Sequence, residues 1–336
     1  MIQGGQAQLA RPGSAGPRSP FWGFILRRLL LGIVVLILVS IVVFAATQAL
    51  PGDAARAILG RSSTPASLQA LREQLHLNRP LIVQYLTWAG GLLHGDAGIS
   101  LAAREPVTKL IGDRILNSAF LVLCSGLISI PLSILIGSYA ALRRDKTFDI
   151  VSSLATLVFA ALPEFVVGVA LVVLLATTVL QVLPAVSMIT PGTPPWDQPQ
   201  ALVLPTLTLV LAVTPYVARI MRASMIEVLE SDYVEMARLK GLPEQIVIRR
   251  HALPNALGPT FQVIALNLAY LAGGVIVVEF VFNYAGIGGA LRDAVATRDL
   301  PVIQALAMVI AGLYVVLNLL ADIGTILVTP RLRTRL

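Results

Sequence analysis

The side chains of this sequence that most clearly suggest chemistry are carboxylates within or beside apolar runs. Glu164 follows Pro163 inside a long uncharged run, and Glu279 follows another such run. A charged side chain at the centre of a membrane helix costs about 2.5 to 3.5 kcal/mol, so each carboxylate needs a compensating role. For Glu164, a place on a polar pathway and a hydrogen bond between helices are two equally supported hypotheses.

The other reactive groups are too few or too scattered for catalysis. None of the three lysines, Lys109, Lys146 and Lys240, follows a glycine, so the Gly-Lys-Ser/Thr motif of a phosphate-binding loop is absent. The three histidines lie far apart, and Cys124 is the single cysteine. We therefore expect no catalytic residues, no metal site and no cofactor bound by this chain.

Long apolar segments dominate the chain and must position these groups. The sequence has 336 residues, of which 56% are hydrophobic and 13% charged, about half the charged fraction of a soluble domain. A span needs about 20 apolar residues. We predict an all-α, polytopic membrane protein with six transmembrane helices at about 29–50, 115–142, 150–182, 201–222, 253–281 and 301–328. Residues 1–22 are expected to form a disordered arm that precedes a transmembrane domain at 23–336.

Basic residues indicate the orientation of these spans. Arg143, Arg144 and Lys146 lie between the second and third spans, whereas the two short loops on the other side carry only Arg292 and Arg298. The positive-inside rule therefore predicts that both termini are cytoplasmic. The formal charge of +7 is then a topology signal, and we expect no binding to nucleic acid.

The predicted extracytoplasmic segment, residues 51–117, is too long to be a simple connector. Thr64 as N-cap and Pro65 at the first helical position predict a helix there. A second apolar stretch, residues 80–93, is able to lie flat on the membrane surface. A lid packed on the bundle and a docking surface for a partner are the alternatives for this segment.

The predicted cytoplasmic segment, residues 223–254, mixes charged and apolar residues at helical spacing. Gly241 suits the position just past a helix end, where a positive φ is needed. Pro243 starts a second helix, and Pro254 marks the point where that helix gives way to the fifth span. Such a helix-elbow-helix predicts a socket for a cytoplasmic partner, and an amphipathic helix on lipid headgroups is the alternative.

This cytoplasmic segment also resembles a known family. Glu235-Met236-Ala237, Gly241 and residues 251–254 have the spacing of the EAA loop of permease subunits in binding-protein-dependent ABC importers, and the ending His-Ala-Leu-Pro-Asn is typical of the dipeptide, oligopeptide and nickel branch. Further matches to that branch lie at residues 95–100, 223–225, 232–234, 279–282, 286–288 and 298–301. The resemblance covers about residues 23–336.

The resemblance implies the ABC type I importer permease fold in a bacterial cytoplasmic (inner) membrane. It implies a homologous second permease as heterodimer partner, two ABC ATPase subunits that bind ATP and Mg, and an extracytoplasmic solute-binding protein, all assembled in membrane lipid. The residues implied in ATPase coupling are Tyr233, Glu235, Met236, Ala237, Arg238, Gly241 and Leu242. Glu164 and Glu279 are the candidates for a translocation path or gate, Glu164 by attracting the ammonium of a peptide and Glu279 by gating or partner contact.

The function expected from this resemblance is passage of short peptides, or a related solute, by alternating access coupled to separate ATPase subunits. The same architecture would also serve nickel complexes, glutathione or opines. A self-contained secondary transporter is the hypothesis from another class, and inverted repeats would favour it. No internal repeat is visible between residues 23–180 and 181–336.

Overall fold

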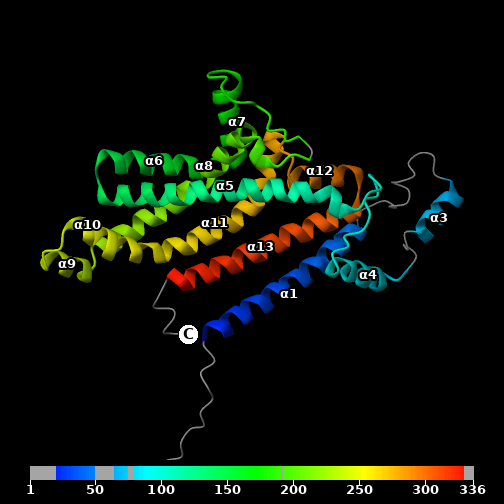
Figure 1. The fold of residues 1–336 in the computed structure, drawn as a ribbon, viewed down its shortest axis with the longest axis horizontal. Helices are drawn as coiled ribbons and strands as arrows, with labels where there is room; N and C mark the ends of the chain where they lie inside the picture. Colours follow the sequence, from blue (N-terminus) through cyan, green and yellow to red (C-terminus); the bar gives the residue numbers. More distant parts are fainter. Residues whose placement is uncertain (1–19, 50–63, 75–78, 191, 329–336) are drawn as a thin grey trace, which may run out of the picture.

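The described part of the chain consists of helices and the loops that join them. Figure 1 shows the computed structural model, which describes residues 20–49, 64–74, 79–190 and 192–328. Across these ranges the single strand-like pairing is an isolated bridge between Ile99 and Pro106. The predicted all-α class is therefore confirmed. Most of the predicted N-terminal arm falls outside the described residues, but α1 (Pro20–Ala49) begins inside it, with proline at its first position.

Within the described residues, four helices are individually long and apolar enough to cross a membrane. They are α1, α5 (Val107–Leu142), α8 (Pro199–Leu229) and α13 (Leu300–Val328). Two bent pairs also qualify, so the described residues contain up to six spans if each pair counts as one. The first pair joins α6 (Thr147–Ala161) to α7 (Glu164–Leu171) and a π-helical turn, and the second comprises residues 244–268 and 273–282. These elements lie where the sequence places its six apolar segments.

The third apolar segment breaks sharply at Pro163. The two halves meet at 107°, and Figure 1 shows α7 projecting from the bundle while α6 lies along it. Leu162 adopts an extended backbone, with φ −90° and ψ 132°, before Pro163 opens α7. A proline disfavours the helical conformation of the residue before it, which accounts for the break.

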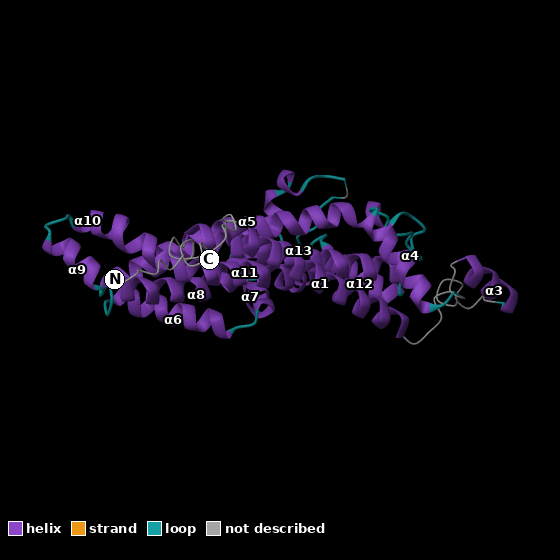
Figure 2. Ribbon diagram, turned by 90° about the horizontal axis from the view of Figure 1, so that it is seen from below, coloured by secondary structure: helices purple, strands orange, loops and turns teal. Residues whose placement is uncertain are grey.

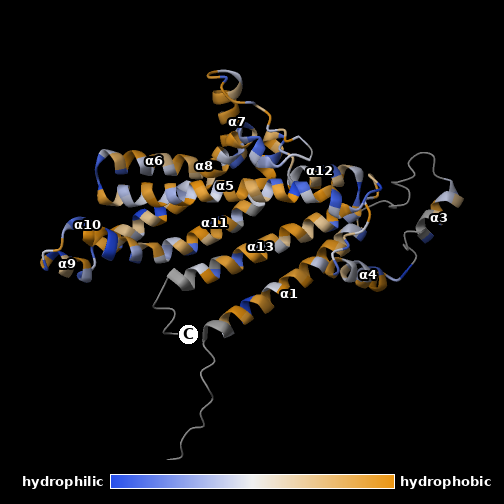
Figure 3. Cartoon of the chain, in the orientation of Figure 1, coloured by the Kyte–Doolittle hydropathy of each residue, from blue (hydrophilic) through white to orange (hydrophobic). Residues whose placement is uncertain are grey.

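The cytoplasmic and extracytoplasmic segments predicted from the sequence lie at opposite ends of the molecule. Figures 1 and 2 place α9 (Asp232–Leu239) and α10 (Glu244–Ile246) at one end, and α3 (Pro65–Gln74) and α4 (Leu81–Leu93) at the other. Figure 3 shows mostly hydrophobic colouring along α1 and α6 and more hydrophilic colouring around α10. Thr64 caps α3 as expected, because its hydroxyl accepts a hydrogen bond from the Ser67 amide at 3.2 Å.

A core of three helices holds the bundle together. Helices α5, α8 and α11 (Leu253–Phe282) supply most of the central buried cluster, which includes Leu121, Leu209 and Leu271. Gly137 brings α5 close to α8, since a Cβ there would lie 2.5 Å from the carbonyl oxygen of Ala218. Small residues allow this approach between membrane helices, which gains packing contacts that lipid does not supply.

Helix α1 packs mainly on α13. A Cβ at Gly32 would lie 2.7 Å from Val315 Cγ1, and Arg28 Nε forms an ion pair with Asp322 at 3.1 Å. Phe44 of α1 also contacts the rings of Tyr85 and Trp88 on α4. Most other side chains of α1 are exposed in the isolated chain, and 11% of its apolar window is buried.

The helix after the elbow passes into α11 at Leu253, next to Pro254, where the sequence places the change to the fifth span. Residues 247–252 form a π-helical turn that passes directly into α11, and Pro254 lies in the first turn of α11. A wider turn tolerates the missing amide of the proline, so the chain continues as a helix from Glu244 to Leu268. The elbow is therefore coupled rigidly to the fifth apolar segment.

Candidate functional site

Helix α9 has two apolar sides, one packed against the rest of the protein and one exposed to solvent. Val234 is fully buried and Ala237 is 6% exposed, and both pack against Val247 of the π-helical turn. An isolated helix of this length is marginal in water. Packing on Val247 therefore fixes the orientation of α9 relative to the start of α11.

The outer side of α9 and the turn after it carry an exposed apolar surface, which we call the elbow tip. Tyr233, Met236, Leu239 and Leu242 form it, with exposed fractions of 43%, 55%, 74% and 37%. Glu235, between them in sequence, is also exposed. Exposed apolar groups rimmed by polar ones are typical of a protein contact surface.

Two features fix the turn that follows α9. Gly241 has φ +74°, as the sequence predicts, and its amide donates to the Arg238 carbonyl oxygen at 2.9 Å. Arg238 spans the elbow and contacts Glu244 at 2.8 Å. The hydrogen bonds with Glu244 raise the pKa of Arg238, so the guanidinium stays charged. All seven residues assigned to coupling therefore lie within one short helix and its turn.

Glu164 lies where the two bent spans meet. It is the first residue of α7, directly after the break at Pro163, and its Oε2 accepts a hydrogen bond of 2.5 Å from the Tyr270 hydroxyl. Tyr270 belongs to the interval between residues 268 and 273, where α11 bends by 53°. A Cβ at Gly274 would lie 3.2 Å from Glu164 Oε1, so this glycine makes room for the carboxylate.

A cavity of about 790 Å³ opens beside this pair. Its walls come from α1, α7, α11, α12 (Ile287–Thr297) and α13, and they are apolar except for the side chains of Glu164, Tyr270 and Tyr314. Breaks in membrane helices are tolerated where they line a cavity or are covered by protein. The arrangement therefore places a carboxylate and a phenol at the edge of an apolar space.

Glu279 lies elsewhere, inside a hydrogen-bonded cluster that we call the Glu279 knot. The side chain is 1% exposed, and its carboxylate accepts hydrogen bonds from the Ser118 hydroxyl and from the Gly288 amide, the latter at 2.7 Å. A Cβ at Gly286 would overlap this carboxylate. In this conformation Glu279 ties α5 to the first turn of α12, and it also lies in the wall of a cavity of about 440 Å³.

Asn117 extends the knot on the α5 side. Its side-chain amide donates to the Ala285 carbonyl oxygen at 2.8 Å, and its backbone carbonyl oxygen accepts from the Tyr284 hydroxyl at 2.9 Å. The turn containing Ala285 is thus fixed by contacts with a distant helix.

Three partner residues escaped the sequence analysis. Tyr270, Ser118 and Glu244 lie 106, 161 and 6 positions from Glu164, Glu279 and Arg238 respectively. The contact between Arg238 and Glu244 could have been predicted from the sequence, because an acidic residue directly after Pro243 starts a helix close to a basic residue. The other two depend on tertiary packing, and no spacing rule connects such distant positions. Within the described residues, no group of three His, Cys, Asp or Glu side chains is placed to hold a metal ion.

At the opposite end, Asp299 anchors the loop after α4. Its carboxylate accepts hydrogen bonds from the Ser100 hydroxyl and from the amides of Leu101 and Ala102, at 3.1 and 3.2 Å for the two amides. Two segments that match the same permease branch, residues 95–100 and 298–301, are therefore in direct contact.

Replacing Asp299 by alanine should loosen this loop. Hydrogen bonds to a charged acceptor contribute about 1.5 to 3 kcal/mol each, and the exposed Arg104 becomes cleavable when the loop opens. We expect trypsin to cut at Arg104 at least tenfold faster, roughly the effect of losing one such bond. Asp113→Ala, which removes an exposed carboxylate on α5, is the control. Equal cleavage of the two variants would contradict the anchoring role.

Comparison with known families gives matches over nearly the whole chain. The model described as "Binding-protein-dependent transport system inner membrane component" matches residues 133–334. A second model, described as "Binding-prot-dependent transport system membrane comp, N-term", matches residues 21–119. Together they include the elbow, Glu164 and Glu279.

Curated relatives align over most of this chain and almost all of their own length. A probable peptide ABC transporter permease protein from Sinorhizobium fredii is 37% identical over 312 residues, which are 92% of this chain and 99% of that protein. A glutathione transport system permease protein from Salmonella choleraesuis is 36% identical over 310 residues, 92% of this chain and 98% of that protein. A putative peptide transport system permease protein from Brucella abortus is 35% identical, with the same coverage. A solved amino acid ABC transporter chain aligns with a TM-score of 0.48 and 19% identity, over 68% of this chain and 95% of that chain.

Proposed function

Because the chain belongs to the family of inner membrane components of binding-protein-dependent transport systems, we propose that it imports short peptides or a glutathione-like solute by alternating access. It does so as one permease of a heterodimer, with two ATPase subunits below and a solute-binding protein above. Relatives named for peptide and for glutathione transport support this solute class. Nickel complexes and opines are less well supported, because none of the relatives described above carries such a name.

The elbow tip is the observation that carries the coupling part of the proposal. Its apolar side chains are exposed at the end of the molecule, while Val234 and Ala237 fix the helix from behind. The chain has no nucleotide-binding motif of its own, so a force applied at α9 must come from another subunit. The continuous helix from Glu244 to Leu268 then transmits that force to the bend near Tyr270.

Alternating access requires elements with two arrangements, and the bent spans supply them. Both breaks meet at the hydrogen bond between Glu164 and Tyr270, beside the apolar cavity. Discontinuous helices commonly form the substrate sites of transporters. ATP binding shifts the equilibrium only as far as its affinity differs between the two conformations, so the elbow must move between them.

Uptake by a Glu164→Gln variant tests the pathway role of this carboxylate. The glutamine still accepts a hydrogen bond from Tyr270 but has no charge to attract an ammonium group. We expect the KM for a peptide with a free amino terminus to rise roughly tenfold, the equivalent of about 1.4 kcal/mol. The measurement is uptake by vesicles that contain the complete importer.

Tyr270→Phe is the matched variant, because it keeps the charge of Glu164 and removes the hydrogen bond. The pathway role predicts a smaller change in KM for this variant than for Glu164→Gln. Unchanged uptake and ATPase coupling in Glu164→Gln, together with loss of both in Tyr270→Phe, would assign the pair a structural role alone.

The coupling proposal is tested by crosslinking from the elbow tip. A photoreactive residue at Met236, which is 55% exposed, should crosslink to an ATPase subunit in the assembled importer. A photoreactive residue at Leu93, 88% exposed at the opposite end, should not. Crosslinks from Met236 that reach only lipid would overturn the proposal.

A further inference from the structure

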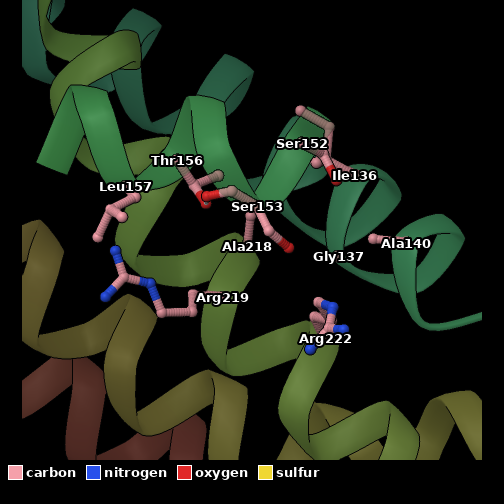
Figure 4. Close-up of a pocket in the computed structure, with 10 residues that line it drawn as sticks. All are labelled: Ile136, Gly137, Ala140, Ser152, Ser153, Thr156, Leu157, Ala218, Arg219 and Arg222. Atoms are coloured by element: carbon pink, nitrogen blue, oxygen red, sulfur yellow. Dashed lines mark hydrogen bonds between the residues drawn. The ribbon is translucent and has the colours of Figure 1, made fainter. Parts of the chain in front are cut away.

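A second cavity, of about 310 Å³, lies between α5, α6 and α8. Figure 4 shows its polar side chains, with the Arg219 side chain extended from α8 toward Leu157 of α6. Serine and threonine hydroxyls from α6 face arginines from α8 across this space, and Ile136 and Leu157 supply apolar walls. The polar lining comprises Ser152, Ser153, Thr156, Arg219 and Arg222. We call this cavity the α6–α8 pocket.

The two arginines of the pocket differ in their partners. Arg222 holds Asp149 through two hydrogen bonds, of 2.5 Å from Nε and 2.7 Å from Nη2, so this pair is neutral as a unit. Arg219 is exposed, and no carboxylate of the described residues pairs with it. The pocket therefore carries one uncompensated positive charge.

The position of Arg219 along α8 sets its depth in the bilayer. Residues 201–218 carry no charge, and at about 1.5 Å per residue they extend about 27 Å, close to the thickness of the hydrocarbon core. Arg219 is the first charged residue beyond this stretch, toward the end that carries α9. It therefore lies where the hydrocarbon meets the phosphate layer of that leaflet.

From this charge, depth and shape we infer that the α6–α8 pocket binds the phosphate of an anionic phospholipid of the inner leaflet. The guanidinium of Arg219 pairs with the headgroup phosphate. The hydroxyls of Ser153 and Thr156 donate within α6, and rotation of these side chains redirects them toward the same oxygen atoms. Basic pockets between membrane helices on the cytoplasmic side are suited to anionic headgroups.

The surface next to the pocket favours a lipid over free phosphate. The adjoining side of α6 exposes Ile150, Leu154, Leu157 and Val158, each more than half exposed and all uncharged. Acyl chains attached to the bound phosphate would lie along this surface, whereas inorganic phosphate would use the polar half alone. The site lies between the elbow and the break at Pro163, so an occupied pocket would fasten α6 to α8.

Native mass spectrometry of the complete importer, purified from nanodiscs of phosphatidylcholine and phosphatidylglycerol, tests the inference. The wild type should retain phosphatidylglycerol in preference to phosphatidylcholine, and Arg219→Gln should reduce that retention about fivefold. Arg143→Gln removes an exposed charge from the same end of the bundle without touching the pocket, and it should retain the lipid. Arg219→Lys keeps the charge and should preserve most of the binding.

Two further measurements separate the sources of the bound anion. Inorganic phosphate at millimolar concentration should leave the phosphatidylglycerol in place, and displacement by it would assign the pocket to free phosphate. A photoreactive residue at Leu157 should crosslink to lipid. Crosslinks to the second permease alone, or equal lipid retention by wild type and Arg219→Gln, would overturn the inference.

Discussion

Replacing Gly241 by valine should abolish ATP-driven uptake while the subunit remains in the membrane. The backbone at Gly241 has φ +74°, and a β-branched residue is strongly disfavoured there. The cost is at least about 1 to 2 kcal/mol, and it arises from the backbone alone, since a Cβ would meet no atom within 4 Å. The turn should relax to another geometry, and the elbow tip should lose its position relative to α11.

The measurement is binding-protein-stimulated ATPase activity of the reconstituted importer, which we expect to fall more than tenfold. Gly192→Val is a matched control, because Gly192 has φ +78° and equally open surroundings. This glycine lies between α7 and α8, away from the elbow, so the control should bear similar strain and keep its coupling. If Gly241→Val instead removes the subunit from the membrane, the elbow serves folding rather than coupling.

Replacing Glu279 by alanine should destabilise the folded subunit by about 3 kcal/mol. The change leaves the buried Gly288 amide and Ser118 hydroxyl without their acceptor, and each unsatisfied buried group costs about 1 to 3 kcal/mol. Glu279→Gln keeps one acceptor oxygen, so its loss should be smaller. Thermal unfolding of the purified importer, followed through this subunit, measures both changes.

Asp293→Ala is the control for the Glu279 variants, since Asp293 is an exposed carboxylate on the neighbouring α12. It should change thermal stability little, because exposed ion pairs contribute less than about 1 kcal/mol. A Glu279→Ala variant with wild-type stability and no transport would favour the gating hypothesis over the structural role of the knot.

The sequence was most informative where one local rule decides the conformation. Thr64 and Pro65 start α3, and Gly241 has the positive φ expected of a residue after a helix end. The apolar segments also coincide with helices in the structure, because hydropathy and length suffice to place a span. None of these features depends on a distant partner.

The effects of the prolines could not be predicted from sequence alone. Pro163 breaks its helix by 107°, whereas Pro205 and Pro215 lie inside α8 without interrupting it. Pro205 and Pro215 are buried against other helices, which hold the chain helical around them, while Pro163 follows an exposed Leu162. Pro254 is tolerated through a π-helical turn. The same residue type thus gives three outcomes, and tertiary packing selects among them.

The candidate site divides in the same way. Tyr233 to Leu242 form one local unit, so their grouping followed from sequence. The partners of Glu164 and Glu279 come from other helices, and they give the two acids different surroundings: Glu164 lies at the edge of an apolar cavity, and Glu279 is almost fully buried in its hydrogen-bonded knot. A hydropathy pattern treats both acids alike.

The contact between α1 and α13 has a consequence for biosynthesis. Among the described helices, α1 is synthesised before the others, and it packs mainly on α13, which is synthesised after them, through Gly32 against Val315 and Arg28 against Asp322. During translation α1 therefore has few protein contacts until α13 is synthesised, whereas the core of α5, α8 and α11 is able to assemble earlier. A nascent chain that stops before Leu300 lacks the main packing partner of α1, and the contacts of Phe44 with Tyr85 and Trp88 of α4 must then hold this helix to the protein.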